Sequence, residues 1–211
     1  MMLKTLLIGA ILMTGLSTAH DASATTDRIL MVVRDDSRDQ DLMLEKEVFV
    51  MQNILQEAGF EIDVVTVNDE HLTGNVSLAP NLAFSDIDIS NYAGLILPCM
   101  AAEPGKAMPE KVVHLIRRAN DAQLPIGAMR GSVRELARAG ALEGHRYSYA
   151  RQVDLDDHPE FRNAIFEGTG VSKDRRISTA GICPLAAKVL GGTDGTITLT
   201  KAFIEAVQAS P

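Results

Sequence analysis

One sharp turn in the sequence carries the pattern that most resembles a catalytic centre. Residues 126–132 read IGAMRGS, so an apolar strand passes into a helix within about one residue. This is the geometry of a nucleophile elbow, in which the residue at the bend projects into a pocket under backbone strain. We expect Met129 at that bend. A thioether has no proton to lose, so the turn is suited to covalent catalysis but its side chain is not.

Two cysteines, Cys99 and Cys183, are the next candidates for chemistry. A free cysteine is commonly a small buried hydrophobe, but a thiol whose pKa a neighbouring cation lowers becomes a nucleophile. A disulfide needs Cα atoms about 4.4–6.8 Å apart, which the sequence alone does not guarantee. Pairing of the two cysteines therefore stays open at this point.

Short apolar segments alternate with helical patterns along most of the chain. Strands are predicted at 29–33, 61–67, 93–98 and 125–129, helices at 42–58, 109–119, 132–141 and 199–208, and less regular strands at 147–153 and 176–179. Fully apolar strands that alternate with helices predict a mostly parallel sheet with helices on both faces. We therefore expect one α/β domain over residues 25–211, a flavodoxin-like or Rossmann-like three-layer sandwich. Ligands bind such folds beyond the carboxyl ends of the strands.

The first 24 residues are typical of a secretory signal peptide. Lys4 supplies a positive charge, residues 5–16 are apolar, and Ala22-Ser23-Ala24 fits the small-residue cleavage rule. The apolar run is too short to cross a bilayer, which needs roughly 20 apolar residues. We expect cleavage, a periplasmic or secreted protein, and no membrane association afterwards.

The composition argues against several classes of partner and cofactor. The net charge of −8 and the absence of Trp disfavour nucleic acids and anionic membranes. The sequence has no dinucleotide, P-loop or serine-hydrolase motif, and its histidines lack metal-ligand spacing. The acidic residues 35–41 lack the glycine and terminal glutamate of an EF-hand and predict a solvated loop. We expect no cofactor and no metal.

Several segments, taken in order, resemble the ThiJ/PfpI family of the class I glutamine amidotransferase-like superfamily, which includes the Parkinson-associated deglycase. The likeness spans about residues 28–207. The segments are RILMVV, EAGF, GLILP, PIGAMRGS, LARAGALEGHRYS and ISTAGICP. No single segment is diagnostic, but their order and spacing together are specific.

The resemblance implies roles for individual residues. The catalytic cysteine of the family would fall on Met129, and the residue after it, often histidine, on Arg130. The helix-borne glutamate that supports the cysteine maps to Glu47, twelve residues before Gly59. The missing cysteine argues against the peptidase, glyoxalase and deglycase activities of the family. The resemblance also implies a homodimer.

Two residues have alternative interpretations. Glu47 is either a pocket carboxylate with a raised pKa, able to act as a general base, or a solvated helix residue. Arg130 either binds a carboxylate or phosphate or forms a salt bridge with Glu47 or Glu135. Gly131 lets the helix approach the sheet closely.

These observations leave three hypotheses. The first is a redox-responsive or small-molecule-binding protein whose pocket is formed by Glu47, Cys99, Met129, Arg130 and Cys183. The second is an enzyme that uses Cys99 as a relocated nucleophile and Glu47 as base. The third is a non-catalytic structural homodimer.

Overall fold

The computed structural model describes residues 27–100 and 106–210, and the structural statements below refer to these residues. The predicted signal peptide, residues 1–24, lies outside the described residues. No helix in the described ranges is long and apolar enough to cross a membrane.

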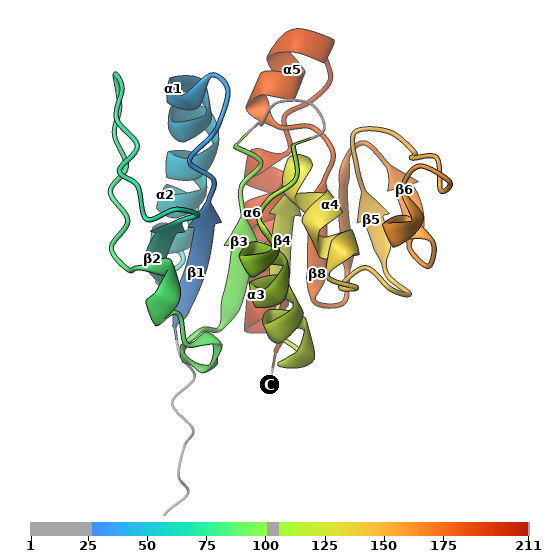
Figure 1. The fold of residues 1–211 in the computed structure, drawn as a ribbon, viewed down its shortest axis with the longest axis horizontal. Coiled ribbons are helices and arrows are strands. Elements are labelled where there is room, and N and C mark those ends of the chain that lie inside the picture. Colours follow the sequence, from blue (N-terminus) through green and yellow to red (C-terminus); the bar gives the residue numbers. More distant parts are fainter. Residues whose placement is uncertain (1–26, 101–105, 211) are drawn as a thin grey trace, which may run out of the picture.

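A six-stranded sheet forms the centre of the domain (Figure 1). Its strands, in spatial order, are β2 (Glu61–Thr66), β1 (Arg28–Val33), β3 (Gly94–Leu97), β4 (Ile126–Met129), β8 (Ile177–Ala180) and β7 (Val171–Asp174). Neighbouring strands are parallel except β7, which pairs antiparallel with β8. The predicted mostly parallel sheet is therefore confirmed.

Helices cover both faces of this sheet, so the predicted α/β sandwich is confirmed (Figure 1). One face carries α3 (Glu110–Asp121) and α4 (Gly131–Arg138). The other carries α1 (Gln40–Met43), the π-helix η1 (Leu44–Val48), α2 (Phe49–Glu57) and α6 (Thr196–Gln208). Strand β1 explains why both faces need cover. Its Leu30 and Val32 pack with the first helix layer, whereas Ile29, Met31 and Val33 pack with the second.

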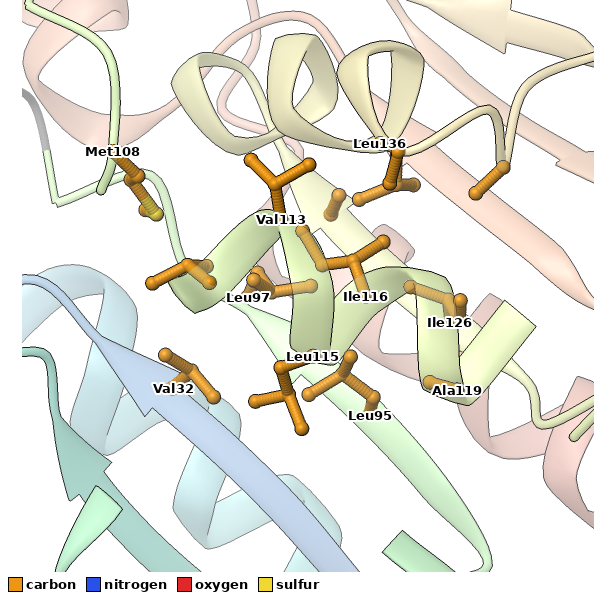
Figure 2. Packing of buried hydrophobic residues seen from close by; sticks show 14 of the residues in the cluster. Val32, Leu95, Leu97, Met108, Val113, Leu115, Ile116, Ala119, Ile126 and Leu136 are labelled. Atoms are coloured by element: carbon orange, nitrogen blue, oxygen red, sulfur yellow. The ribbon is translucent and has the colours of Figure 1, made fainter. Parts of the chain in front are cut away.

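The layer on the α3 side is built mainly from aliphatic side chains. Figure 2 shows Val113 and Ile116 of α3 lying against Leu97 of β3 and Leu136 of α4. All four side chains are buried. The same layer also buries the rings of Tyr92, Tyr147 and Phe161.

The opposite layer is packed so closely that the sheet needs glycine. A Cβ added to Gly94 would lie 2.7 Å from Phe203 of α6, and one added to Gly127 would lie 3.1 Å from the same ring. Both glycines therefore let α6 lie directly on β3 and β4. This layer also contains Glu47 and both cysteines.

The first long helical segment contains a wider turn. The predicted helix at 42–58 corresponds to the continuous run α1, η1 and α2, and its predicted apolar stripe of Leu44, Val48, Met51 and Leu55 is buried. The π-turn lies at Leu44–Val48 and contains Glu47. Such turns are rare within helices and occur frequently at functional sites.

The second half of the chain differs most from the sequence-based expectations. The strand predicted at 147–153 is present but shorter: β5 (Arg146–Ser148) ends at Ser148 and pairs with β6 (Ile165–Gly168) in a separate two-stranded sheet. The Ser148 amide donates to Thr179 Oγ1 of β8, so a side chain links the small sheet to the large one. Strands β6 and β7 and the helix α5 (Pro184–Leu190) have no counterpart among the predicted elements.

Two helix boundaries also differ. Helix α4 ends at Arg138 rather than 141, because Gly140 adopts a φ of +78° that stops the helix. Helix α6 begins at Thr196 rather than 199, where the Asp194 carboxylate accepts from the Thr196 amide and hydroxyl. The remaining short turns are the 3₁₀ segments η2 (Phe84–Asp86), η3 (Ile89–Asn91) and η4 (Pro159–Phe161).

Candidate functional site

Glu47 is a fully buried carboxyl group at the carboxyl end of the sheet. Its relative exposure is 0%, so the solvated alternative is wrong. The Cys99 amide donates to Oε1 at 3.0 Å and the Met100 amide to Oε2 at 3.1 Å. Burial, together with the nearby charge of Cys183, raises the pKa of Glu47 well above its usual range, although both amide bonds oppose this. The carboxyl group fixes the backbone that leaves β3.

The segment after β3 adopts an unusual conformation at the point where Glu47 holds it. Met100 has a φ of +39°, in the left-handed region that non-glycine residues rarely occupy. The turn directs the consecutive amides of Cys99 and Met100 to the two oxygens of one carboxyl group. A buried carboxyl with both oxygens engaged accounts for a backbone conformation that is otherwise costly.

The two cysteines meet beside Glu47. Both are free thiols, 2% and 1% exposed for Cys99 and Cys183, and a hydrogen bond links their two sulfurs. This bond, together with burial, raises the pKa of Cys99 well above its usual range. The same bond lowers the pKa of Cys183 to about 7, helped by the amides of Ala186 and Leu185 and by the charge of Arg130. The pairing that the sequence left open is thus a thiol–thiol contact.

The strained residue of the turn after β4 is Arg130, and the expectation that Met129 lies at the bend is wrong. Met129 is the last residue of β4 and is fully buried in the α6-side layer. Arg130 has a φ of 38° and a ψ of −96°, and its amide donates to Ala180 at 2.6 Å. The strand pairing of Met129 with Ala180 holds Met129 in extended conformation, so the reversal falls one residue later.

Arg130 does not form the salt bridge considered for it. Its Nη1 donates to the carbonyl of Gly181 at 3.3 Å, and it lies close enough to Cys183 to lower the pKa of that thiol. Glu135 instead pairs with Arg138 and accepts from the Met108 amide. The guanidinium therefore places a positive charge beside the thiol pair.

The start of α4 is tied to the end of β3. Ser132 Oγ donates to the carbonyl of Pro98 at 2.6 Å, and the Gly131 amide donates to the Cys99 sulfur. A Cβ added to Gly131 would lie 3.5 Å from Cys99 Sγ, an ordinary van der Waals contact. The close approach expected at Gly131 is present, but the space there does not itself require glycine.

A second feature at the same edge of the sheet is a charged cavity of about 180 Å³. Its lining residues follow β1 and β2 and precede α3: Arg34, Asp35, Asp36, Val67, Asn68, Lys106, Ala107, Met108 and Pro109. The chain changes its direction of growth across the sheet between β1 and β3, which is where ligands bind in this class of fold. None of the expected pocket residues, Glu47, Cys99, Met129, Arg130 or Cys183, lines this cavity.

The acidic segment 35–41 is partly structural, so its description as a solvated loop is wrong for its first residues. Asp36 accepts from Nε of the buried Arg34 at 2.7 Å, and Lys106 approaches it at 2.6 Å. The bond from Arg34 lowers the pKa of Asp36 to about 2. Asp35 accepts from the amide and the side chain of Asn68. These carboxylates hold the loop after β1 against its neighbours.

The comparison with protein families identifies the family. The DJ-1/PfpI family profile matches residues 27–186. The chain belongs to the DJ-1/PfpI family. The ThiJ/PfpI resemblance is thereby confirmed. An uncharacterized protein of Archaeoglobus fulgidus is 23% identical over 155 residues, which are 72% of this chain and 88% of that protein.

Solved structures of the family share the fold at low identity. A ThiJ/PfpI domain protein from Brachyspira murdochii has a TM-score of 0.66 and 18% identity, covering 88% of this chain and 99% of its own. A DJ-1 superfamily protein from Agrobacterium tumefaciens has a TM-score of 0.61 and 19% identity, with 87% and 99% coverage. DJ-1beta of Drosophila melanogaster has a TM-score of 0.57 and 17% identity, with 87% and 98% coverage.

The structure brings most of the predicted site residues together. Glu47, Cys99 and Cys183 form one cluster, Arg130 lies beside it, and Met129 belongs to the same apolar layer. Sequence reasoning missed the amides that complete the cluster, those of Met100, Leu185 and Ala186. Backbone donors leave no residue-type signal. It also missed the charged cavity, although the turn that begins at Arg34 stands at the end of a predicted strand.

Proposed function

We propose that this DJ-1/PfpI protein is an exported, redox-responsive member of the family whose reactive group is the Cys99–Cys183 thiol pair. The observation that carries the proposal is the contact between two free, buried thiols in one apolar cluster. Two thiols in contact convert to a disulfide with the loss of two electrons and two protons. The compartment to which a signal peptide leads permits such bonds.

The bend after β4 supports a function other than nucleophilic hydrolysis. The residue with the strained backbone is Arg130, whose guanidinium stays protonated and is no nucleophile. Met129 beside it is a buried thioether. We therefore propose that the family position for a cysteine nucleophile is degenerate here, with the strained position taken by arginine.

The alternative in which Cys99 attacks a substrate and Glu47 acts as base has less support. Both oxygens of Glu47 already accept backbone amides. Hydrogen bonding to Cys183 and burial raise the pKa of the Cys99 thiol, which lowers its thiolate fraction.

Thiol counting tests the redox proposal. The purified mature protein is reduced, exposed to a mild oxidant, denatured and labelled with a maleimide, and its intact mass is measured. We expect the oxidised protein to take up no label and to recover both thiols after reduction. It should show no disulfide-linked dimer in denaturing, non-reducing gels. Cys99→Ser and Cys183→Ser each keep one thiol and serve as controls. Two labelled thiols in the oxidised parent would refute the proposal.

A pair of cysteine substitutions tests the assignment of the bend. Arg130→Cys places a thiol on the strained backbone, and Met129→Cys places one in the buried strand. Both are made in a Cys99→Ser, Cys183→Ser background, so each variant has a single thiol. We expect Arg130→Cys to react with iodoacetamide at least about tenfold faster, because reactivity follows exposure and thiolate character. Faster labelling of Met129→Cys would show that Met129, and not Arg130, occupies the exposed position of the bend.

Export, a small-molecule ligand and a homodimer complete the proposal. Export rests on the apolar N-terminal pattern of residues 1–24. N-terminal sequencing of the protein from a periplasmic fraction is expected to begin after Ala24. A homodimer is expected in sedimentation velocity. Exposed apolar side chains at Val189, Leu190 and Ile197 make the α5–α6 end a candidate surface for such an interface.

A further inference from the structure

Arg34 is a buried cation that lines the charged cavity of about 180 Å³, and its residue is only 4% exposed. Its Nε and Nη2 donate to the carboxylate of Asp36, which leaves Nη1 without a partner in the part of the chain that the structure describes. Nη1 is still in contact with solvent, because Ser178 Oγ is the one fully buried side-chain nitrogen or oxygen without a partner among the described residues. The free edge of the guanidinium therefore opens into the cavity.

The charges that line this cavity are not fully matched to one another. Lys106 Nζ lies 2.6 Å from Asp36 Oδ2, so Arg34 and Lys106 share one carboxylate and one positive charge is left over. Across the described residues, Asp35 accepts only from the amide and the side chain of Asn68, and both of these donors are neutral. The lining therefore presents one unmatched positive charge and one unmatched negative charge.

Apolar side chains complete the lining and are firmly held. Val67 and Met108 both line the cavity and are each 2% exposed. The Met108 amide donates to Oε1 of the buried Glu135 at 3.0 Å, and the Met108 carbonyl accepts from Arg138 at 3.0 Å. Fixed polar groups beside apolar surface are typical of a small-molecule site that is formed before its ligand arrives.

We propose that this cavity binds a small zwitterion, a free α-amino acid with a short apolar side chain. The carboxylate of the ligand accepts from Nη1 of Arg34 and from Lys106. Its ammonium group donates to Asp35, and its side chain contacts Val67 and Met108. The inference goes beyond the proposed function, because neither of the two cysteines lines the cavity.

The volume and the charge balance of the cavity decide the class of ligand. Drug-sized ligands occupy pockets of about 300–1,000 Å³, whereas a cavity of about 150 Å³ accepts benzene. The present volume of about 180 Å³ therefore suits a molecule of roughly six to ten non-hydrogen atoms. Two cationic and two anionic side chains line the cavity, so a bound anion or cation leaves an excess charge and a zwitterion leaves none.

Three ligands of similar shape test the proposal on the parent protein. L-Valine carries both charges, its 2-hydroxy acid analogue lacks the ammonium group, and isobutylamine lacks the carboxylate. Each is titrated at neutral pH into protein labelled with ¹⁵N, and the amide shifts are followed by NMR. We expect valine to bind at least about tenfold more tightly than either analogue, because each analogue leaves one charge of the site unmatched. Equal affinity for the hydroxy acid would overturn the assignment of a zwitterion, and no binding of valine would overturn the site.

The same spectra locate the ligand and separate this proposal from the thiol pair. We expect the shifts to concentrate at the amides of Asn68, Ala107 and Met108, which line the cavity. A Cys99→Ser, Cys183→Ser double variant should bind valine as tightly as the parent does. Shifts centred on Cys183, or loss of valine binding in a folded double variant, would overturn the location.

Two substitutions test the roles of the opposite charges. Lys106→Met should weaken valine binding about threefold, a modest effect because this side chain is 56% exposed. Lys201→Met, at an exposed position of α6, is the matched control and should bind valine as the parent does. Asp35→Asn should weaken valine binding about tenfold without weakening that of the hydroxy acid. Equal losses for both ligands, or none for valine, in a variant whose thermal unfolding shows that it is folded would overturn the role of Asp35.

Discussion

The carboxyl edge of the sheet carries two clusters of ionisable groups that differ in how they are stabilised. Around Arg34, Asp36 pairs with the cations Arg34 and Lys106, and the cluster lines a cavity. Around Glu47, a carboxyl group and two thiols are buried with Arg130 as a nearby cation. The first lowers the pKa of its carboxylate, and the second raises the pKa of Glu47 and of Cys99.

The difference separates ion-paired groups, whose charged forms are stabilised, from buried acids, whose charged forms are not. Ion pairs such as Arg34 with Asp36 stabilise the charged forms and resist a change of protonation near neutral pH. Buried acids without a full counter-charge keep their protons and respond to small changes around them. Strongly perturbed groups of this second kind mark functional sites more often than structural ones. Three predictions test the contrast.

Gly181→Ala is expected to have the largest effect. A Cβ there would lie 2.4 Å from the carbonyl oxygen of Tyr149 and 2.6 Å from that of Thr169, both backbone atoms that cannot turn away. We expect a loss of about 3 kcal/mol or more of unfolding free energy in urea, because the chain leading from β8 to Cys183 must shift. Gly170→Ala, where an added Cβ meets no atom within 4 Å, is the control and should cost little. Equal stability of the two variants would contradict the packing described here.

Glu47→Gln should change how stability depends on pH. The pKa of Glu47 is raised in the folded state. Between about pH 4.5, where the unfolded chain releases its proton, and the raised pKa of the folded state, the native protein still holds that proton. The parent should therefore lose stability as pH rises through this range, by about 1 kcal/mol or more. The variant should lack this loss, and Glu45→Gln, an exposed neighbour, should keep it. The opposite result would be a parent that gains stability as pH rises over this range while Glu47→Gln does not. That result would show that Glu47 is charged in the folded protein.

Arg34→Met should have a smaller effect on stability, and the pH dependence that it removes has the opposite sign to that of Glu47. Asp36 has a pKa of about 2 in the folded state against 3.8 ordinarily, so its contribution is present above pH 4 and is lost as pH falls through 2. At neutral pH the variant should be about 1 kcal/mol less stable, and the difference should shrink in acid. Arg151→Met, at an exposed position, is the control. A constant difference across this pH range would mean that Arg34 acts through packing alone.

The sequence predicted the central sheet well because its strands are continuous apolar runs. Strands β1 to β4 and the helices between them follow from local patterns of residues such as Leu30 and Val113. Strands β6 and β7 did not, because their residues are partly exposed and their pairing is set by distant segments. At the site, residue types identified Cys99 and Cys183, and the family resemblance identified Glu47. The contact between the thiols, and the shift of the bend to Arg130, depend on the register of β4 with β8, which no local pattern reports.

An equilibrium redox titration tests the central claim most directly. The parent protein is incubated in buffers of graded dithiothreitol ratio, quenched with acid, and labelled with a maleimide under denaturing conditions. The account predicts a single two-electron transition in which both thiols disappear together, with Cys99 linked to Cys183 in the digest. Two independent one-thiol changes, or two free thiols across the whole range, would contradict it.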